Sequence, residues 1–394
     1  MTGRPHVRYA GLASLALAGV LIAPRPPEAG QVPPVDGPSD LPREEKFNPA
    51  RMKSTLVVPV TRVERFRYPV LDAHSHAYAK DAEAIASWVR LMDQVGIRTS
   101  LILSGATGEK LRALTARYAG AHPGRFVLMA GFARDGIAEP GYGERLRRGL
   151  REDVEAGAAG LGELTDKGLG LVREGDRAYP VDDPRFDPLW EEAGRLGVPV
   201  FVHIAEPAAF YEPPDERNDL RRSENWSLYG KGTPGFAAML EKFERVLSRH
   251  PRTQFVSVHA FNLANDLGAV GALLDRHPNV QVDFAARMWE LARQPFTARR
   301  FFLTYQDRIL FGTDNDPEAS MYLAHARQLE TEDEWFWPPD AEWWRGYGMK
   351  LPDDVLRKVY RANAERLLAR ETGARVFIDP HPIPPHVGEG TAAH

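Results

Sequence analysis

Histidines and acidic residues recur at the ends of short apolar segments along the chain. Two histidines two positions apart, His74 and His76, follow the apolar segment 68–73. In extended backbone, side chains at positions i and i+2 point the same way, so both imidazole rings can reach one ion. Later apolar segments end at, or are closely followed by, a further imidazole or carboxylate, namely Glu163, His203, His259 and Asp314. Four imidazoles and two carboxylates suit Zn²⁺, Mn²⁺ or Fe²⁺ as ligands.

The elements that must position these residues form a regular alternation. The apolar segments have the length and two-sided hydrophobicity of strands in a buried parallel sheet; they are residues 68–73, 99–103, 126–131, 158–164, 198–204, 254–259, 280–284 and 309–312. Helical periodicity covers residues 81–94, 108–119, 188–196, 234–249 and 267–276, with Gly or Pro near most helix ends. Eight strands and about seven helices predict a single-domain α/β protein, a (β/α)8 TIM barrel. An open doubly wound sheet is the alternative, but no G-x-G-x-x-G follows the first strand.

The predicted barrel brings the six candidate residues together. The C-terminal ends of all strands open on one face, which is where barrel enzymes keep their active sites. A lone H-x-H is incidental more often than functional, and each other residue alone fits a structural role. Their placement at successive strand ends is what predicts a metal site. The role of Glu163 is left open by the sequence. If Glu163 is a shared ligand the site can hold two ions, and if it is a structural acid the site holds one.

Composition excludes several alternatives. The chain has no cysteine, which rules out thiolate ligands, disulfides and thiol nucleophiles. A net charge of −4 without a long basic run gives no reason to expect a nucleic acid as partner. We therefore expect a small-molecule substrate.

The two ends of the chain differ in composition from its middle. Residues 1–30 combine basic positions with an apolar stretch over 10–23, which predicts a signal peptide or, alternatively, a short N-terminal anchor. The stretch is short for a hydrocarbon core of roughly 30 Å, which favours the signal peptide. No later stretch approaches 18 consecutive apolar residues, so no membrane span is expected after signal removal. The protein is then exported, to the periplasm or beyond. Residues 31–65 predict a linker and N-terminal arm, 66–372 the barrel, and 373–394 a Pro-rich tail.

The set of motifs resembles the amidohydrolase superfamily, and within it the amidohydrolase-2 branch. The similar features are H-S-H at 74–76, single histidines at the ends of the fifth and sixth segments, and Asp314 in F-G-T-D. The stretches 307–314 and 351–364 are especially similar, and the resemblance covers about residues 66–370.

The resemblance implies metal-ligand roles for His74, His76, His203 and Asp314. It also implies that Asp314 handles a proton and that His259 binds a second metal or polarises the substrate. The sequence departs from the urease-like pattern because the predicted strand 4 does not end in lysine. Glu163 is closer to the strand-4 glutamate of TatD-type members, so the number of ions, one or two, stays open. Zinc is expected first, with manganese or iron as alternatives.

These residues predict a metal-dependent hydrolase that acts on an amide, ester, lactone or similar bond. A divalent ion makes a nucleophilic water available near neutral pH, and Asp314 beside it can take the proton. Arg287 follows the seventh predicted strand and suits a substrate carboxylate or phosphate, although a barrel-rim ion pair is the alternative.

Two other functions fit the same residues. One is a metal-dependent non-oxidative decarboxylase of an aromatic or conjugated acid, and the other is a non-catalytic binding protein on the same barrel. Residues 205–233 and 332–350 are expected to line the pocket but contain no readable substrate code. A homodimer is also compatible with this type of barrel.

Overall fold

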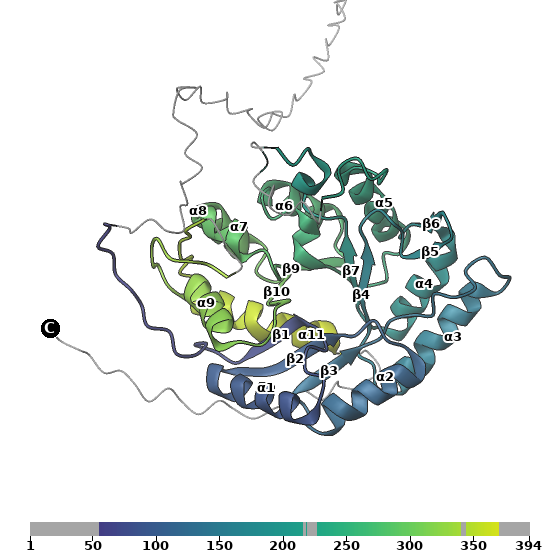
Figure 1. Cartoon of the computed structure of the whole chain (residues 1–394), viewed down its shortest axis with the longest axis horizontal. Helices are drawn as coiled ribbons and strands as arrows, with labels where there is room; N and C mark the ends of the chain where they lie inside the picture. Colours follow the sequence, from purple (N-terminus) through teal and green to yellow (C-terminus); the bar gives the residue numbers. More distant parts are fainter. Residues whose placement is uncertain (1–54, 216–217, 219–226, 340–343, 370–394) are drawn as a thin grey trace, which may run out of the picture. The chain divides into compact units, whose positions relative to one another are not determined.

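Eight parallel strands with helices around their outside make up the fold (Figure 1). The computed structural model describes residues 55–215, 218, 227–339 and 344–369. One sheet runs in the order β1 (Val70–Ser75), β2 (Ile97–Leu103) and β3 (Phe126–Met129). The other runs β10 (Ile309–Leu310), β9 (Val280–Asp283), β8 (Phe255–Ser257), β7 (Val200–Ile204) and β4 (Leu161–Asp166).

Backbone hydrogen bonds at two seams close these sheets into one barrel. Between β3 and β4, the Ala130 N–H donates to the Gly160 carbonyl at 2.8 Å, and the Gly162 N–H donates to the Ala130 carbonyl at 2.8 Å. Between β10 and β1, the Ala73 N–H donates to the Phe311 carbonyl at 2.8 Å. The chain is therefore a (β/α)8 TIM barrel, as the alternation predicted, and the open sheet is excluded.

Alternate side chains of the strands fill the barrel interior. The buried interior cluster includes Leu71, Ala73, Leu101, Leu103, Val127, Met129, Phe201 and Val256. Ala364, Leu367 and Leu368 of α11 (Asn363–Leu368) belong to the same cluster. Asn363 Nδ2 donates to the Gln306 and Ile309 carbonyls at 2.7 and 2.8 Å, which places α11 at the N-terminal end of the strands. The opposite end carries the candidate site.

The outer helices begin and end at the expected local signals. In α1 (Ala82–Val95), the Asp81 carboxylate accepts from the Ala84 N–H at 2.9 Å, and Gly96 ends the helix at φ 98°. The other helices are α2 (Gly108–Thr115), α3 (Tyr142–Glu155), α4 (Asp187–Leu196), α5 (Phe236–Arg249), α6 (Leu267–Arg276), α7 (Met288–Arg293), α8 (Pro295–Thr304), α9 (Ala319–Glu330) and α10 (Asp353–Arg357).

Several boundaries differ from the sequence-based prediction. The fourth strand starts at Leu161 rather than 158 and continues to Asp166, so Glu163 lies within β4 and Lys167 directly follows it. A hairpin of β5 (Val172–Glu174) and β6 (Arg177–Tyr179) was not predicted, and a short helix, Ala208–Tyr211, lies inside the segment 205–233 that is expected to line the pocket. Helix α3 escaped prediction because its buried stripe is narrow among many charged residues.

The predicted termini lie largely outside the described residues. These are the signal or anchor at 1–30, the linker up to residue 54 and the tail at 373–394. Among the described residues, no helix is both long and apolar enough to cross a membrane. The described part of the arm is held by Asp333, whose carboxylate accepts from Thr61 N at 2.8 Å and from Thr61 Oγ1 at 2.6 Å.

We predict that Asp333→Ala lowers the free energy of unfolding by about 2 kcal/mol. The carboxylate is 3% exposed and also accepts from Arg327 Nε at 2.6 Å, so its loss leaves several donors without an acceptor. Urea denaturation measures the change. The neighbouring Glu332→Ala is the control, because Glu332 pairs with Lys350 on the exposed surface and should change stability by less than about 1 kcal/mol. Equal effects of the two substitutions would contradict the anchoring role.

Candidate metal centre

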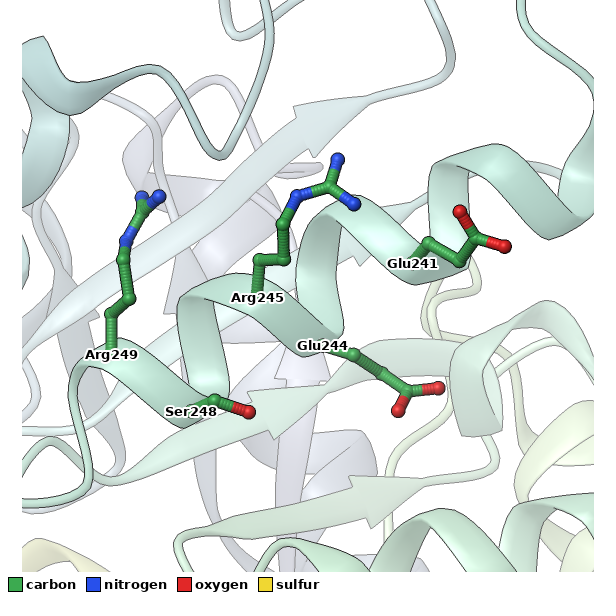
Figure 2. Close-up of a pocket in the computed structure, with 5 residues that line it drawn as sticks. All are labelled: Glu241, Glu244, Arg245, Ser248 and Arg249. Atoms are coloured by element: carbon green, nitrogen blue, oxygen red, sulfur yellow. The ribbon is translucent and has the colours of Figure 1, made fainter.

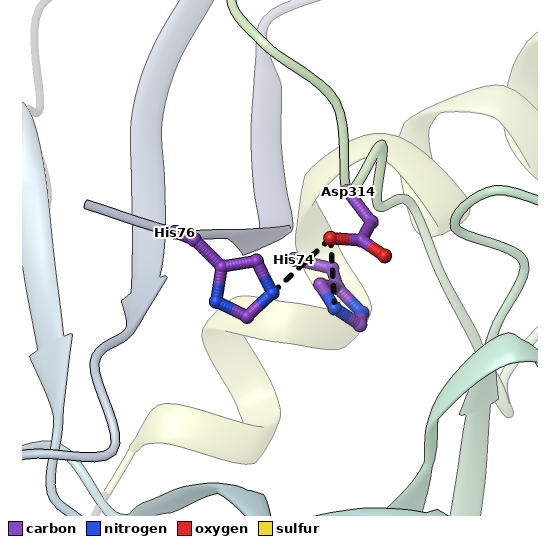
Figure 3. Close-up of side chains that lie close together, drawn as sticks. All are labelled: His74, His76 and Asp314. Carbon is purple, nitrogen blue, oxygen red and sulfur yellow. Dashed lines mark ion pairs between the residues drawn. The ribbon is translucent and has the colours of Figure 1, made fainter. Parts of the chain in front are cut away.

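The six predicted residues lie together at the C-terminal end of the barrel. His76 Nε2 is 3.1 Å from Asp314 Oδ1, and His74 Nε2 is 3.7 Å from the same oxygen (Figure 3). His259 Nε2 is 3.8 Å from Asp314 Oδ2. Strand β1 and the segments that follow β1, β8 and β10, which are far apart in sequence, therefore contribute to one cluster.

Glu163 occupies the middle of this cluster. Its Oε1 lies 3.6 Å from His259 Nε2 and 3.9 Å from His74 Nε2, and its Oε2 lies 3.7 Å from His76 Nε2. The carboxylate is therefore close enough to serve as a ligand alongside all three imidazoles.

Three histidines are each oriented by a hydrogen bond between Nδ1, the ring nitrogen that points away from the cluster, and an oxygen acceptor. The Nδ1 atoms of His74, His76 and His259 lie 2.9, 2.9 and 2.7 Å from Asp283 Oδ2, the Leu103 carbonyl and the Ala285 carbonyl. A carbonyl cannot donate, so Nδ1 carries the proton in His76 and His259, and a carboxylate favours the same tautomer in His74. Each Nε2 lone pair then faces the cluster, as in metal-binding histidines.

His203 has a different orientation. Its Nδ1 lies 2.7 Å from Glu163 Oε1, within hydrogen-bond distance. Its Nε2 has no hydrogen-bond partner among the described residues and lies 3.7 Å from Glu206 Oε2. Glu206 forms an ion pair with Lys167, the residue that follows β4. The lysine near the end of strand 4 thus contacts Glu206.

The donor atoms fit a divalent ion. Nitrogen and oxygen ligands lie about 2.0–2.2 Å from zinc, so two ligands of one ion lie at most about 4.4 Å apart. The His74, His76, His259, Glu163 and Asp314 separations above, from 3.1 to 3.9 Å, satisfy that limit. His74 is fully buried, and its Nε2 has no hydrogen-bond partner among the described residues. Such an atom is costly without a ligand, which an ion would supply.

The electrostatics of the cluster favour a positive charge at its centre. Burial alone would lower the pKa of His74, but Asp283, Asp314 and Glu163 outweigh it and raise that pKa to about 10. Burial would raise the pKa of Asp314, yet His74 and His76 hold it well below its ordinary value. Burial lowers the pKa of His259, which favours the neutral ligand form. The ionised carboxylates therefore stabilise a cation, whether a proton or a metal ion.

Left-handed residues turn the chain shortly after each of four strands. The non-glycine residues Ala205, His259, Ala286 and Asp314 have φ of 61°, 55°, 50° and 54° and follow β7, β8, β9 and β10. Each such residue costs roughly 1–2 kcal/mol in backbone energy. The bends place His259 and Asp314 over the barrel mouth, which is a common location for strain of this kind.

Two buried acids that hold the cluster were missed by the sequence analysis. Asp283 faces His74 Nδ1, and its other oxygen accepts from the His259 N–H at 2.8 Å. Asp72 accepts from the Thr313 N–H at 3.1 Å and from Thr313 Oγ1 at 2.6 Å, which links β1 to the loop that carries Asp314. Both lie in strands beside candidate residues, and an acid in a buried strand was the available signal.

Arg287 lies in the loop after β9, next to the loop that holds His259. Its Nη1 donates to the Ala286 carbonyl at 2.6 Å, and its Nη2 donates to Asn262 Oδ1. The predicted rim ion pair is weak in geometry, because Nε lies 4.0 Å from Glu290 Oε1.

A surface depression on α5 involves none of these residues. The depression has a volume of about 530 Å³ and is lined by side chains of α5. Figure 2 draws these side chains, which are Glu241, Glu244, Arg245, Ser248 and Arg249. Arg245 and Arg249 pair with Asp182 and Asp187 at 2.8 Å in both cases. Its arginines are therefore already neutralised, and the depression contributes nothing to the candidate centre.

The model of an amidohydrolase family matches residues 72–370, which is most of the chain. The protein therefore belongs to the amidohydrolase-2 family, whose members are metal-dependent enzymes. The comparison with curated proteins found no match.

Solved structures similar to this chain share little of its sequence. An uncharacterised TIM-barrel protein from Bordetella bronchiseptica is 17% identical, with 76% of this chain and 98% of that chain covered and a TM-score of 0.47. A 2,6-dihydroxybenzoate decarboxylase from Rhizobium is 19% identical, with the same coverage and TM-score. An amidohydrolase from Burkholderia multivorans with bound zinc is 12% identical, with 77% and 99% covered and a TM-score of 0.41. These similarities do not indicate which reaction this protein catalyses.

We predict that Asp283→Asn weakens divalent-metal binding by about 10- to 100-fold, as the loss of a ligand's orienting partner usually does. The amide can still occupy the space, but it presents a weaker acceptor to His74 Nδ1 and to the His259 N–H. Competition with a chelating dye measures the affinity. Asp275→Asn is the matched control, because Asp275 contacts the exposed Tyr305 hydroxyl outside the cluster. Unchanged metal affinity in Asp283→Asn would contradict the orienting role.

Proposed function

We propose that this protein is a metal-dependent hydrolase that cleaves an amide, ester, lactone or similar bond of a small molecule. The observation that carries the proposal is the convergence of three Nε2 atoms and two carboxylates at the barrel mouth. His74, His76 and Asp314 are the proposed first ligands, and Glu163, His203 and His259 form a second group that can share the ion or hold another. When bound, a divalent ion supplies an activated water and polarises a carbonyl oxygen.

Asp314 is the proposed proton acceptor and donor of the reaction. Its lowered pKa keeps the carboxylate ionised at neutral pH, so it can accept a proton and later return it to the leaving group. Tyr78 donates a hydrogen bond to Asp314 Oδ1 at 3.2 Å, and burial raises the pKa of the Tyr78 hydroxyl, which keeps it a donor. His259, neutral because of its lowered pKa, can polarise the substrate if it holds no second ion.

The number of ions is the first question about this centre. Two groups, His74–His76–Asp314 and Glu163–His203–His259, each have ligand atoms within 4.8 Å of one another. Purified wild-type protein is expected to contain about one or two equivalents of zinc, manganese or iron by elemental analysis, and the double variant His74→Ala/His76→Ala about none. Metal absent from the wild type even after supplementation would favour the non-catalytic binding protein.

We predict that Asp314→Asn loses turnover by about 100-fold or more, because general acid–base catalysis contributes roughly 10²–10⁴-fold. The amide oxygen remains a weaker ligand, and the imidazoles still hold an ion, so elemental analysis should find metal in the variant. Turnover is measured on a panel of lactones, amides, phosphoesters and aromatic carboxylates. Full activity of the variant would remove Asp314 from its proposed role. Release of CO₂ without hydrolysis would identify a decarboxylase.

Export is part of the proposal as well. N-terminal sequencing of mature protein from cell fractions would find a start near residue 30 in the periplasm or medium if the predicted signal is cleaved. An uncleaved chain in the membrane fraction would instead favour the anchor.

A further inference from the structure

We propose that Arg287, oriented by Asn262, binds a carboxylate of the substrate at a distance from the bond that is cleaved. This inference rests on the proposed hydrolase function and narrows its substrates to anionic amides, esters or lactones that carry a free carboxylate.

The position of Arg287 connects it to the candidate centre. His259 Nδ1 donates to the Ala285 carbonyl at 2.7 Å, and Arg287 follows two residues later in the same loop. Its Nη2 donates to Asn262 Oδ1, in the loop that carries His259. The guanidinium therefore bridges the loops after β8 and β9, and both loops border the centre.

Among the described residues, Arg287 forms a single long ion pair, with Glu290. Its two hydrogen-bond acceptors, the Ala286 carbonyl and the Asn262 amide, are neutral. The Nε atom has no hydrogen-bond partner among the described residues, and the Glu290 carboxylate lies 4.0 Å from it. The side chain is only 12% exposed, so water screens it weakly. A guanidinium has five N–H donors, and one largely removed from water favours an anionic partner.

Asn262 fixes the orientation of that guanidinium. Its Nδ2 donates to the Ile204 and Ala205 carbonyls at 3.1 and 3.2 Å, so its Oδ1 must face Arg287. Asn262 is 1% exposed and ends a run of left-handed residues that starts at His259, with φ of 51–60°. Asparagine adopts this conformation more readily than most residues, and here its side chain also ties together the loops after β7, β8 and β9.

The surroundings favour a carboxylate over a phosphate. Glu163, Asp314 and Glu290 already bring negative charge to this end of the barrel, so a dianion would meet stronger repulsion than a monoanion. One planar guanidinium matches one planar carboxylate in both charge and geometry. A carboxylate held by Arg287 leaves the metal centre to the scissile carbonyl, whereas the carboxylate lost by a decarboxylase substrate must itself reach that centre.

The test compares two ligands of the same shape, benzoate and the neutral benzamide, on full-length protein with its bound ion. Ligand-observed NMR measures the Kd of each for the wild type, Arg287→Met and the control Arg300→Met, which removes an exposed arginine of α8. For Arg287→Met we expect a 10- to 100-fold rise in the benzoate Kd, as for loss of a charged hydrogen bond. The benzamide Kd should change by less than about twofold, and Arg300→Met should leave both unchanged.

The Asn262→Ala variant tests whether Asn262 orients the Arg287 guanidinium or only keeps the loops folded. We expect a smaller rise in the benzoate Kd than for Arg287→Met, with the benzamide Kd unchanged. Thermal unfolding shows whether the variant is folded. A merely structural role would change both ligands equally and would overturn the inference.

Two further outcomes also overturn it. One is a wild type that does not prefer benzoate over benzamide. The other is benzoate binding that is lost on removal of the ion but insensitive to Arg287→Met, because the ion then captures the carboxylate. Elemental analysis and turnover are measured separately, so a metal-free, inactive protein whose benzoate binding depends on Arg287 would refute the hydrolase and not the anion site.

Discussion

The carboxylate of Asp283 is the contact on which the geometry of the candidate centre depends. One oxygen faces His74 Nδ1 and the other accepts from the His259 backbone N–H, so a single side chain of β9 orients a residue of β1 and a residue of the loop after β8. All three residues are buried, where a misplaced polar group would cost far more than on the surface. Burial therefore has two effects on the imidazoles. It makes any departure from these hydrogen bonds unfavourable, and it makes a ring nitrogen without a partner unfavourable as well.

This arrangement places negatively charged carboxylates next to imidazoles that can carry a positive charge, within a small buried volume. Four carboxylates, those of Glu163, Glu206, Asp283 and Asp314, surround four imidazoles. The pKa shifts of His74 and Asp314 show each charge stabilised by the other. A divalent ion would replace the protons that otherwise balance the carboxylates. The site is thus organised for a cation before any substrate arrives, which is the preorganisation that metal-assisted catalysis requires.

Backbone strain and side-chain hydrogen bonds are coupled at the barrel mouth. The left-handed turn from His259 to Asn262 is unfavourable by itself, and the contacts of Asn262 with the Ile204 and Ala205 carbonyls offset part of that cost. The opposite end of the barrel is closed by packing. There α11 covers the interior with apolar side chains and fixes its position through Asn363. Stability at one end and chemistry at the other are thereby separated along the strand direction.

The sequence by itself determined the barrel and the principal candidate ligands. Apolar periodicity depends on burial, and the parallel topology puts every strand end on one face, so His74, His76, His203, His259 and Asp314 could be grouped without coordinates of any atom. Glu163 was found for the same reason, although it lies within β4 rather than at its end. The helices α3 and α7 to α11 and the hairpin of β5 and β6 were not predicted. For α3 and the hairpin the local patterns are too short or too polar to stand out from loops.

Only the tertiary structure decided which nitrogen of each imidazole faces the cluster, and that Asp283, Asp72 and Asn262 hold the loops. These assignments depend on hydrogen bonds between residues separated by 24 to 241 positions, such as Asp283 with His259 and Thr313 with Asp72. A linear pattern records residue type and spacing, but the direction of a side chain follows from left-handed turns and from partners on other strands. Burial makes those partners obligatory, and burial is a property of the packed barrel alone.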